Sequence, residues 1–333
     1  MKDGIRRAGS VSDGSNTPSV AYASGPSSWG GRIAVFGGIY SNHLALSAAL
    51  ADAQARGVEA IYCLGDLGAF GPSPDRVFPL LRDHGVLCIQ GNYDNSIGND
   101  LADCQCGYTD PRDNHFARIS YAYTFANTST ENRAWMRSLP MQRRVLLGAR
   151  RLLMCHGSPR KMNEFLWEST ASTGFLDHLA REQDAEVILA THTGIKWRRD
   201  LAGGRLFVNV GVLGRPENDG TPRVWYAILD DGEAPLLLPS PPVLCSSGVP
   251  PEIRPVGPLT PNPSPPITAA RGTGKDASRL SVEFVPVDYD HERLAAEMRS
   301  EHLPEEFVET VSTGWWTTCL EVLPAKERRR GRY

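Results

Sequence analysis

Four short polar motifs, each directly after an apolar run, constrain the fold of this chain more than any other feature. The first is Gly65-Asp66-Leu67-Gly68, which follows the apolar run at 61–64. Because that run has no polar alternation, it predicts a strand covered on both faces, as in a parallel sheet. The other three motifs follow later apolar runs: Gly91-Asn92-Tyr93-Asp94, Cys155-His156-Gly157-Ser158 and Thr191-His192-Thr193-Gly194. The carboxyl ends of parallel strands meet at one edge of a sheet, so we expect these motifs to lie together.

Strand and helix patterns alternate along most of the chain. The alternation begins with a strand at 32–36, a helix after Asn42, a strand at 60–64, a helix at 75–84 and a strand at 86–89. Later strands are predicted at 143–147, 151–155, 187–190, 206–209 and 223–229, and later helices at 128–135 and 175–182. The polar segment 98–126 is predicted to be a long loop, either a lid or a surface insertion. The alternation indicates an α/β fold with helical crossovers.

The side chains in the four motifs form a set that suits a metal ion. Asp66, Asn92, His156 and His192 offer oxygen and imidazole nitrogen atoms, which are the ligands of first-row divalent ions. Each residue has a plainer alternative, because an aspartate between glycines is often a turn residue and a lone histidine is often structural. Four such residues in this order favour the metal site.

The order of these motifs resembles that of the calcineurin-like metallophosphoesterases, closest to their small bacterial phosphodiesterase-like branch. The resemblance covers about 32–229 and a returning segment near 282–314. It implies an α/β fold in the form of a four-layer αββα sandwich, with the metal site at the carboxyl ends of the strands. It also implies two neighbouring metal ions, with Asp66 in the bridging position and Asn92, His156 and His192 as the remaining ligands of one ion.

The second half of the implied site departs from the family pattern. Where the family has Asp-x-His, this chain has Gly38 and Tyr40, and where the family's last motif ends in histidine it has Gly194. Tyr40 has three open roles, namely a phenol ligand, a proton donor and packing in the vacated space. We therefore expect one firmly bound divalent ion for each chain, either manganese, iron, zinc or nickel.

Three functions fit this pattern. The first is a hydrolase of the metallophosphoesterase type, which would hydrolyse a phosphomonoester or phosphodiester bond in a small phosphorylated substrate. Its catalytic residues are expected to be Asp66, Tyr93, Asp94 and Arg160. Tyr93 stands where many relatives have a histidine that protonates the leaving group. Arg160 is placed to meet a phosphate, although a surface arginine is as good an interpretation. The alternatives are a one-metal enzyme of different chemistry, such as iron-dependent redox chemistry, and a non-catalytic metal-binding or scaffold module.

The net charge and the cysteines indicate which classes of partner to exclude and which cellular compartment to expect. The net charge of −3 and the pI near 6.3 give no general attraction to nucleic acid or to anionic membranes. No apolar run approaches the ~20 residues that a membrane span needs. The seven cysteines follow no secreted pattern, so we expect free thiols and a cytoplasmic location. A thiolate site at Cys104 and Cys106 has weak support, because no second pair stands at zinc spacing.

The chain is expected to form one main domain with an internal insertion. Residues 1–31 are predicted to be a disordered leader, and 32–234 form the metallophosphoesterase-like domain. The Pro/Ser/Gly-rich stretch 235–280 is predicted to be an insertion or linker, and 281–320 to complete the same domain with a strand and helices. An aromatic anchor at Trp315 and Trp316 is expected to close over the core, before a basic tail at 321–333.

Overall fold

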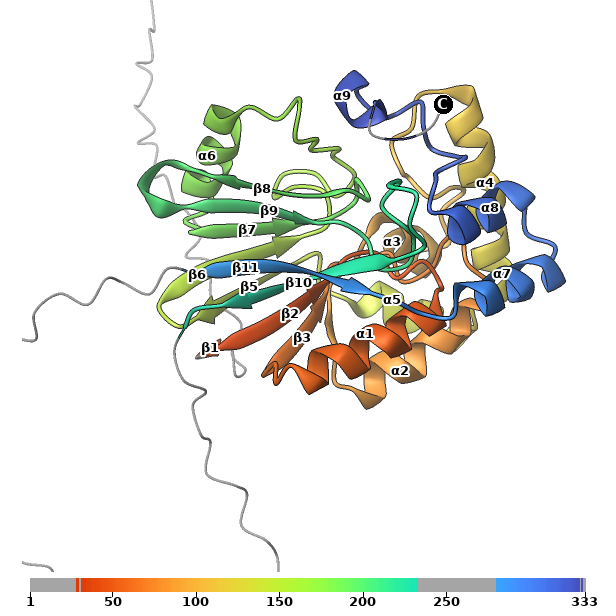
Figure 1. The fold of residues 1–333 in the computed structure, drawn as a ribbon, viewed down its shortest axis with the longest axis horizontal. Coiled ribbons are helices and arrows are strands. Elements are labelled where there is room, and N and C mark those ends of the chain that lie inside the picture. Colours follow the sequence, from red (N-terminus) through yellow and green to blue (C-terminus); the bar gives the residue numbers. More distant parts are fainter. Residues whose placement is uncertain (1–27, 30, 233–279, 330, 332–333) are drawn as a thin grey trace, which may run out of the picture.

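The computed structural model describes residues 28–29, 31–232, 280–329 and 331. Its elements form two sheets that face each other, with helices on both outer faces (Figure 1). Residues 1–27 of the predicted leader and 235–279 of the predicted insertion lie outside the described residues. The disorder of the leader and the linker character of the insertion therefore stay predictions.

The first sheet contains five strands in the order β11-β10-β2-β3-β4. β2 (Arg32–Phe36), β3 (Ala60–Cys63) and β4 (Leu87–Cys88) are parallel to one another. β10 (Val224–Asp230) pairs antiparallel with β2 on one side and with β11 (Ser281–Val287) on the other. The register places Phe36 opposite Cys63 and Cys63 opposite Cys88, so β2, β3 and β4 end at one edge. β11 pairs with β10 along its whole length, so the chain returns to this sheet after the segment that is not described.

The second sheet contains six strands in the order β1-β5-β6-β7-β9-β8. These strands are β1 (Ser28–Trp29), β5 (Gln142–Leu147), β6 (Arg150–Cys155), β7 (Val187–Ala190), β8 (Lys196–Asp200) and β9 (Leu206–Val210). β5 and β6 form the predicted hairpin, and β6, β7 and β9 are parallel. β8 was not predicted, because its charged sequence Lys-Trp-Arg-Arg-Asp is unlike that of a buried strand.

Three apolar layers hold the two sheets and their helices together. Between the sheets, Val35 and Tyr62 of the first sheet pack with Met154 and Val208 of the second. The opposite face of the first sheet is covered by α1 (His43–Ala55) and α2 (Val77–Asp83), which begins after a 3₁₀ turn at Pro74–Arg76. The outer face of the second sheet is covered by α6 (Thr173–Glu182), and a 3₁₀ turn at Ala202–Gly204 precedes β9. These layers confirm the αββα sandwich.

The remaining helices gather at one end of the molecule, beyond the ends of the strands (Figure 1). They are α3 (Asn92–Gly98), α4 (Pro111–Asn127), α5 (Thr130–Ser138), α7 (His291–Ser300), α8 (Glu305–Thr313) and α9 (Ala325–Arg328). α4 packs on the C-terminal helices through Phe116, which lies in one apolar cluster with Met298 and Phe307. The C-terminal part of the chain thus closes this end of the sandwich.

Four local expectations need correction. Much of 98–126 is helical, because Asp110 caps α4 by accepting from the Arg112 N–H and a proline begins the helix. The helix predicted at 128–135 is α5 at Thr130–Ser138, with Ser129 as its cap. Within the predicted leader, Ser28–Trp29 form a short parallel strand with β5. In the predicted basic tail, buried Glu327 accepts a hydrogen bond from the Ser169 N–H at 2.9 Å, so the tail is anchored there. No helix in the described ranges is long and apolar enough to span a bilayer.

Candidate metal centre

Four polar side chains come from the carboxyl ends of strands in both sheets. Asp66 follows β3 and Asn92 begins α3 after β4, while His156 follows β6 and His192 follows β7. The loops that carry Asp66 and Asn92 approach each other closely, since a Cβ on Gly65 would lie 2.1 Å from the Gly91 nitrogen. Asp66 itself has a φ of 57°, in the left-handed region, and its Oδ2 lies 3.2 Å from His156 Nε2 after a strand of the second sheet. The centre therefore spans the two sheets.

The ligand atoms of these four residues converge on the His156 ring. His156 Nε2 lies 3.2 Å from Asp66 Oδ2 and 3.1 Å from Asn92 Oδ1. It also lies 3.2 Å from His192 Nδ1. One ligand atom from each of Asp66, His156 and His192 lies within 4.8 Å of the other two.

Hydrogen bonds to backbone carbonyls fix which atoms face inward. His156 Nδ1 lies 2.7 Å from the Leu64 carbonyl oxygen, which can only accept, so Nδ1 carries a proton and Nε2 is the ring atom that faces the centre. The Asn92 amide nitrogen donates to the Cys104 carbonyl at 2.9 Å, which turns Asn92 Oδ1 toward the centre. The oxygens of Asp66 and Asn92 and the inward ring nitrogens of His156 and His192 thus lie close to one another. This arrangement fits a cation.

Burial and the charges of neighbouring side chains shift the pKa values of the groups in the centre. Asp66 is 3% exposed and His156 is 1% exposed. Burial raises the pKa of Asp66, but the neighbouring His156 outweighs it and brings the pKa of the carboxyl below its usual value. Burial, followed by the proximity of His156, lowers the pKa of His192 to about 3, so that imidazole is neutral. Burial lowers the pKa of His156, but the charge of Asp66 outweighs it and raises that pKa above its usual value, so a metal ion bound there would replace the proton on Nε2. A deprotonated carboxylate and a neutral imidazole are the forms that bind metal ions.

Asp94 faces the backbone and does not face the converging ligand atoms. Its Oδ2 accepts from the backbone N–H groups of Asp66 at 2.7 Å and Gly91 at 2.8 Å. Its Oδ1 accepts from the Leu67 N–H at 3.1 Å. Burial, together with the charge of Asp66, raises the pKa of Asp94 to about 7. Asp94 therefore joins the loop that carries Asp66 to the loop that carries Asn92.

Tyr93 and Arg160 are both engaged with other side chains. The backbone N–H of Tyr93 donates to Asp66 Oδ1 at 3.0 Å, while its hydroxyl donates to Ser120 Oγ on α4 at 2.9 Å. Burial raises the pKa of the Tyr93 hydroxyl well above its usual value. Arg160 is exposed and pairs with Glu164. The structure thus brings Asp66, Asn92, His156 and His192 together and leaves Arg160 on the surface.

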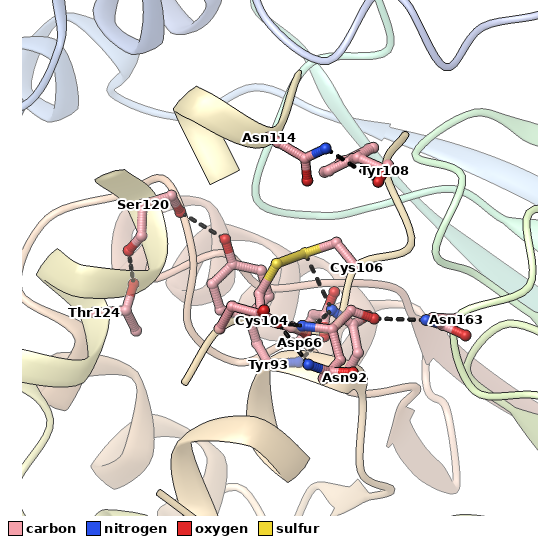
Figure 2. Close-up of a disulfide and its surroundings, with 12 residues drawn as sticks. Asp66, Asn92, Tyr93, Cys104, Cys106, Tyr108, Asn114, Ser120, Thr124 and Asn163 are labelled. Atoms are coloured by element: carbon pink, nitrogen blue, oxygen red, sulfur yellow. Dashed lines mark hydrogen bonds between the residues drawn. A yellow bond between two sulfur atoms is a disulfide. The ribbon is translucent and has the colours of Figure 1, made fainter. Parts of the chain in front are cut away.

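A disulfide between Cys104 and Cys106 covers Asn92 (Figure 2). Cys106 Sγ lies 3.4 Å from the Asn92 amide nitrogen, and Asn163 donates to the Gln105 carbonyl at 2.7 Å from the other side. The expectation of free thiols is therefore wrong for these two cysteines. Cys63, Cys88, Cys155 and Cys319 are buried and unpaired, and Cys245 lies outside the described residues. The close Cys-x-Cys spacing was the only sequence signal for the pair.

Two aromatic rings fill the space beside the centre where ligands were expected and are absent. A Cβ on Gly38 would lie 2.6 Å from Tyr40 Cε1, and a Cβ on Gly194 would lie 2.8 Å from Trp316 Cη2. Burial, and then the charge of Asp66, raises the pKa of the Tyr40 hydroxyl, so the phenol stays neutral. Its ring packs edge-on against Phe70 with centroids 5.3 Å apart. The packing role of Tyr40 is therefore the one that its contacts favour. Trp316 is buried as expected and donates its ring N–H to the Pro216 carbonyl at 2.6 Å.

Comparisons with known proteins agree with this architecture. The family model of the calcineurin-like phosphoesterase superfamily domain matches residues 32–232. The uncharacterized protein MJ0912 of Methanocaldococcus jannaschii is 27% identical over 214 residues, which are 60% of this chain and 82% of that protein. A metallophosphoesterase from Sphaerobacter thermophilus superposes with a TM-score of 0.55 at 23% identity, covering 85% of this chain and 99% of that one. The hypothetical protein PH1004 of Pyrococcus horikoshii superposes with a TM-score of 0.61 at 19% identity, covering 87% and 100%. The two structural likenesses show the fold.

Proposed function

The chain belongs to the calcineurin-like phosphoesterase superfamily, and from that premise we propose that it is a phosphoesterase that works with one firmly held divalent ion. The observation that carries the proposal is the convergence of acceptor atoms on His156 Nε2, at 3.1–3.2 Å from three partners. The neighbouring space, in contrast, is filled by the rings of Tyr40 and Trp316. The proposed substrate is a small phosphorylated molecule, and the proposed location is the cytoplasm.

Asp66, Asn92, His156 and His192 are the residues that would hold the ion. Their mixture of carboxylate, amide and imidazole suits manganese, iron, zinc or nickel. A divalent ion held there would polarise a phosphoryl oxygen and lower the pKa of bound water toward neutrality. Leu64 and Cys104 keep His156 and Asn92 oriented through their carbonyl groups. We assign Asp94 to positioning and not to direct chemistry, because both of its oxygens accept from backbone N–H groups.

The test combines metal analysis with turnover. Protein purified without chelator is assayed with bis(p-nitrophenyl) phosphate and p-nitrophenyl phosphate, as wild type, His192→Ala and the control His178→Ala. His178 is an exposed histidine on α6, so its loss should leave both metal and turnover unchanged. His192→Ala should lose most of the metal together with the turnover, because it removes one of the converging ligands.

The metal count separates the alternatives. About one ion per chain with measurable turnover supports the proposal, and two ions would mean that other residues act as ligands. Protein that binds no ion would contradict the proposal in favour of a scaffold. One ion without turnover of either ester would point to different chemistry, such as redox chemistry at iron.

A further inference from the structure

Arg215 is a buried arginine in the loop that follows β9. It is 6% exposed, and its guanidinium carbon lies 4.1 Å from the ring centroid of Trp316 and 5.3 Å from that of Phe70. The two rings attract the cation through their faces, but such contacts replace only part of the hydration that the guanidinium loses on burial. The charge of Arg215 therefore needs a further partner.

Few groups of the protein interact with the Arg215 guanidinium. One terminal nitrogen of Arg215 donates to the Thr318 carbonyl at 2.8 Å and approaches Thr318 Oγ1 at 3.5 Å. Among the residues that the structure describes, no carboxylate lies within ion-pair distance, and the other two guanidinium nitrogens form no hydrogen bond. Arg205, which is more exposed, is held by Asp177 through two nitrogens. An arginine carries five N–H donors, so most of those on Arg215 remain available.

Arg215 also lies beside the candidate metal centre. It lines a small hollow together with Tyr40, His192 and Gly194, and that hollow holds about 10 Å³. After burial, the two charges that act most on the pKa of the Tyr40 hydroxyl are Asp66, which raises it, and Arg215, which lowers it. Both charges are therefore close enough to act on the Tyr40 phenol.

We propose that Arg215 binds a non-bridging oxygen of a phosphoryl group held beside the candidate metal centre. This inference rests on the proposed function in so far as the phosphoryl group belongs to a substrate. A guanidinium matches two phosphoryl oxygens with its planar fork, and a charge-assisted hydrogen bond is stronger than a neutral one. In a site with a single metal ion, Arg215 provides the second positive charge that the phosphoryl group needs as it reacts.

The experiment measures binding of inorganic phosphate by titration calorimetry. Full-length protein carrying one equivalent of manganese is compared as wild type, Arg215→Met, Arg215→Lys and the control Arg199→Met. Arg199 is a matched arginine, because it donates to the carbonyls of Ala171 and Glu168 and lies 5.6 Å from the Trp197 ring. It contacts none of the four metal ligands.

Arg215→Met should weaken phosphate binding by about 10- to 100-fold, as expected for loss of hydrogen bonds to a charged group. Arg215→Lys should retain part of the affinity, because it keeps the charge without the fork, and Arg199→Met should bind as wild type. Metal content should be the same in all four proteins. Unchanged phosphate affinity in folded, metal-loaded Arg215→Met would overturn the inference, as would a wild type that binds no phosphate.

A crystal structure of the wild type with manganese and phosphate covers the case in which both Arg215 variants fail to fold. A phosphate oxygen about 3 Å from the guanidinium supports the inference, whereas phosphate bound well away from Arg215 refutes it. The outcomes also separate this inference from the proposed function. Ester turnover at the wild-type rate in Arg215→Met would refute the inference and leave the proposed function intact. If Arg215→Met loses phosphate binding but the wild type hydrolyses no ester, the proposed function is refuted and the inference is not.

Discussion

Replacement of Asp94 by alanine tests whether this carboxylate builds the centre or takes part in its chemistry. Asp94 accepts three backbone hydrogen bonds, from the N–H groups of Asp66, Gly91 and Leu67. Asp94→Ala would leave all three groups buried without that acceptor. Each unsatisfied group costs about 1–3 kcal/mol, so the three together amount to about 3–9 kcal/mol.

Repulsion between Asp94 and Asp66 offsets part of that loss. Burial, and then the charge of Asp66, raises the pKa of Asp94 to about 7, so removal of the carboxylate relieves an unfavourable interaction near neutral pH. We therefore expect the free energy of unfolding to fall by about 2–4 kcal/mol, which a domain with about 5–15 kcal/mol of stability tolerates.

The assay is urea unfolding of metal-free protein at pH 7, with Asp290→Ala as a matched control. Asp290 caps α7 and accepts from a single backbone N–H, that of Arg293 at 3.0 Å, so its loss should cost about 1 kcal/mol. A change below about 0.5 kcal/mol in Asp94→Ala would refute the structural role, since a change of that size is ordinary for a surface substitution. Full stability and full metal content without turnover would show that Asp94 acts directly in the reaction.

Two further predictions concern the surroundings of the ligands. Cys106→Ser should weaken metal binding by about tenfold in a chelator competition, because it opens the disulfide that covers a ligand amide, and a reductant should then have no additional effect; equal affinity with and without the disulfide would contradict this. Rebuilding the absent ligands with Gly38→Asp, Tyr40→His and Gly194→His should give no second ion while Trp316 fills the space, but adding Trp316→Ala should allow it. A second ion in the triple variant alone would refute the steric argument.

That Asp66, Asn92, His156 and His192 lie together could be predicted, because each follows a strand at a position that the local sequence defines. An apolar run sets the strand, and the residue after it projects from the carboxyl edge of the sheet, so Asp66 and His156 needed no knowledge of distant contacts. The fold class could be predicted for the same reason, because the hydrophobic periodicity of a strand or a helix depends only on residues that are close in sequence. α4 was missed because its polar sequence has no apolar stripe, although the Asp110-Pro111 start is a recognisable helix signal.

The surroundings of the ligands could not be predicted, because they depend on contacts between distant parts of the chain. Trp316 reaches Gly194 only because α8 and the segment after it pack across the end of the sandwich. The burial of Arg215 likewise depends on Phe70, Trp316 and Thr318, which come from opposite ends of the sequence. In the sequence, Arg215 is one of many arginines with no distinguishing neighbour.

The way in which the space beside the centre is filled favours a working site over a disabled one. Loss of metal ligands alone would leave a polar hollow that water could enter, and nothing would require a buried cation there. Here Tyr40 and Trp316 occupy that space from opposite ends of the chain, and Arg215 lies buried between aromatic rings beside His192. A guanidinium without a carboxylate partner among the described residues lowers the stability of the protein unless an anion neutralises it. Two of the four proposed ligands, His156 and Asn92, meanwhile remain oriented by the backbone carbonyls of Leu64 and Cys104. An intact set of ligands beside a buried positive charge is the arrangement that a bound phosphoryl group would need.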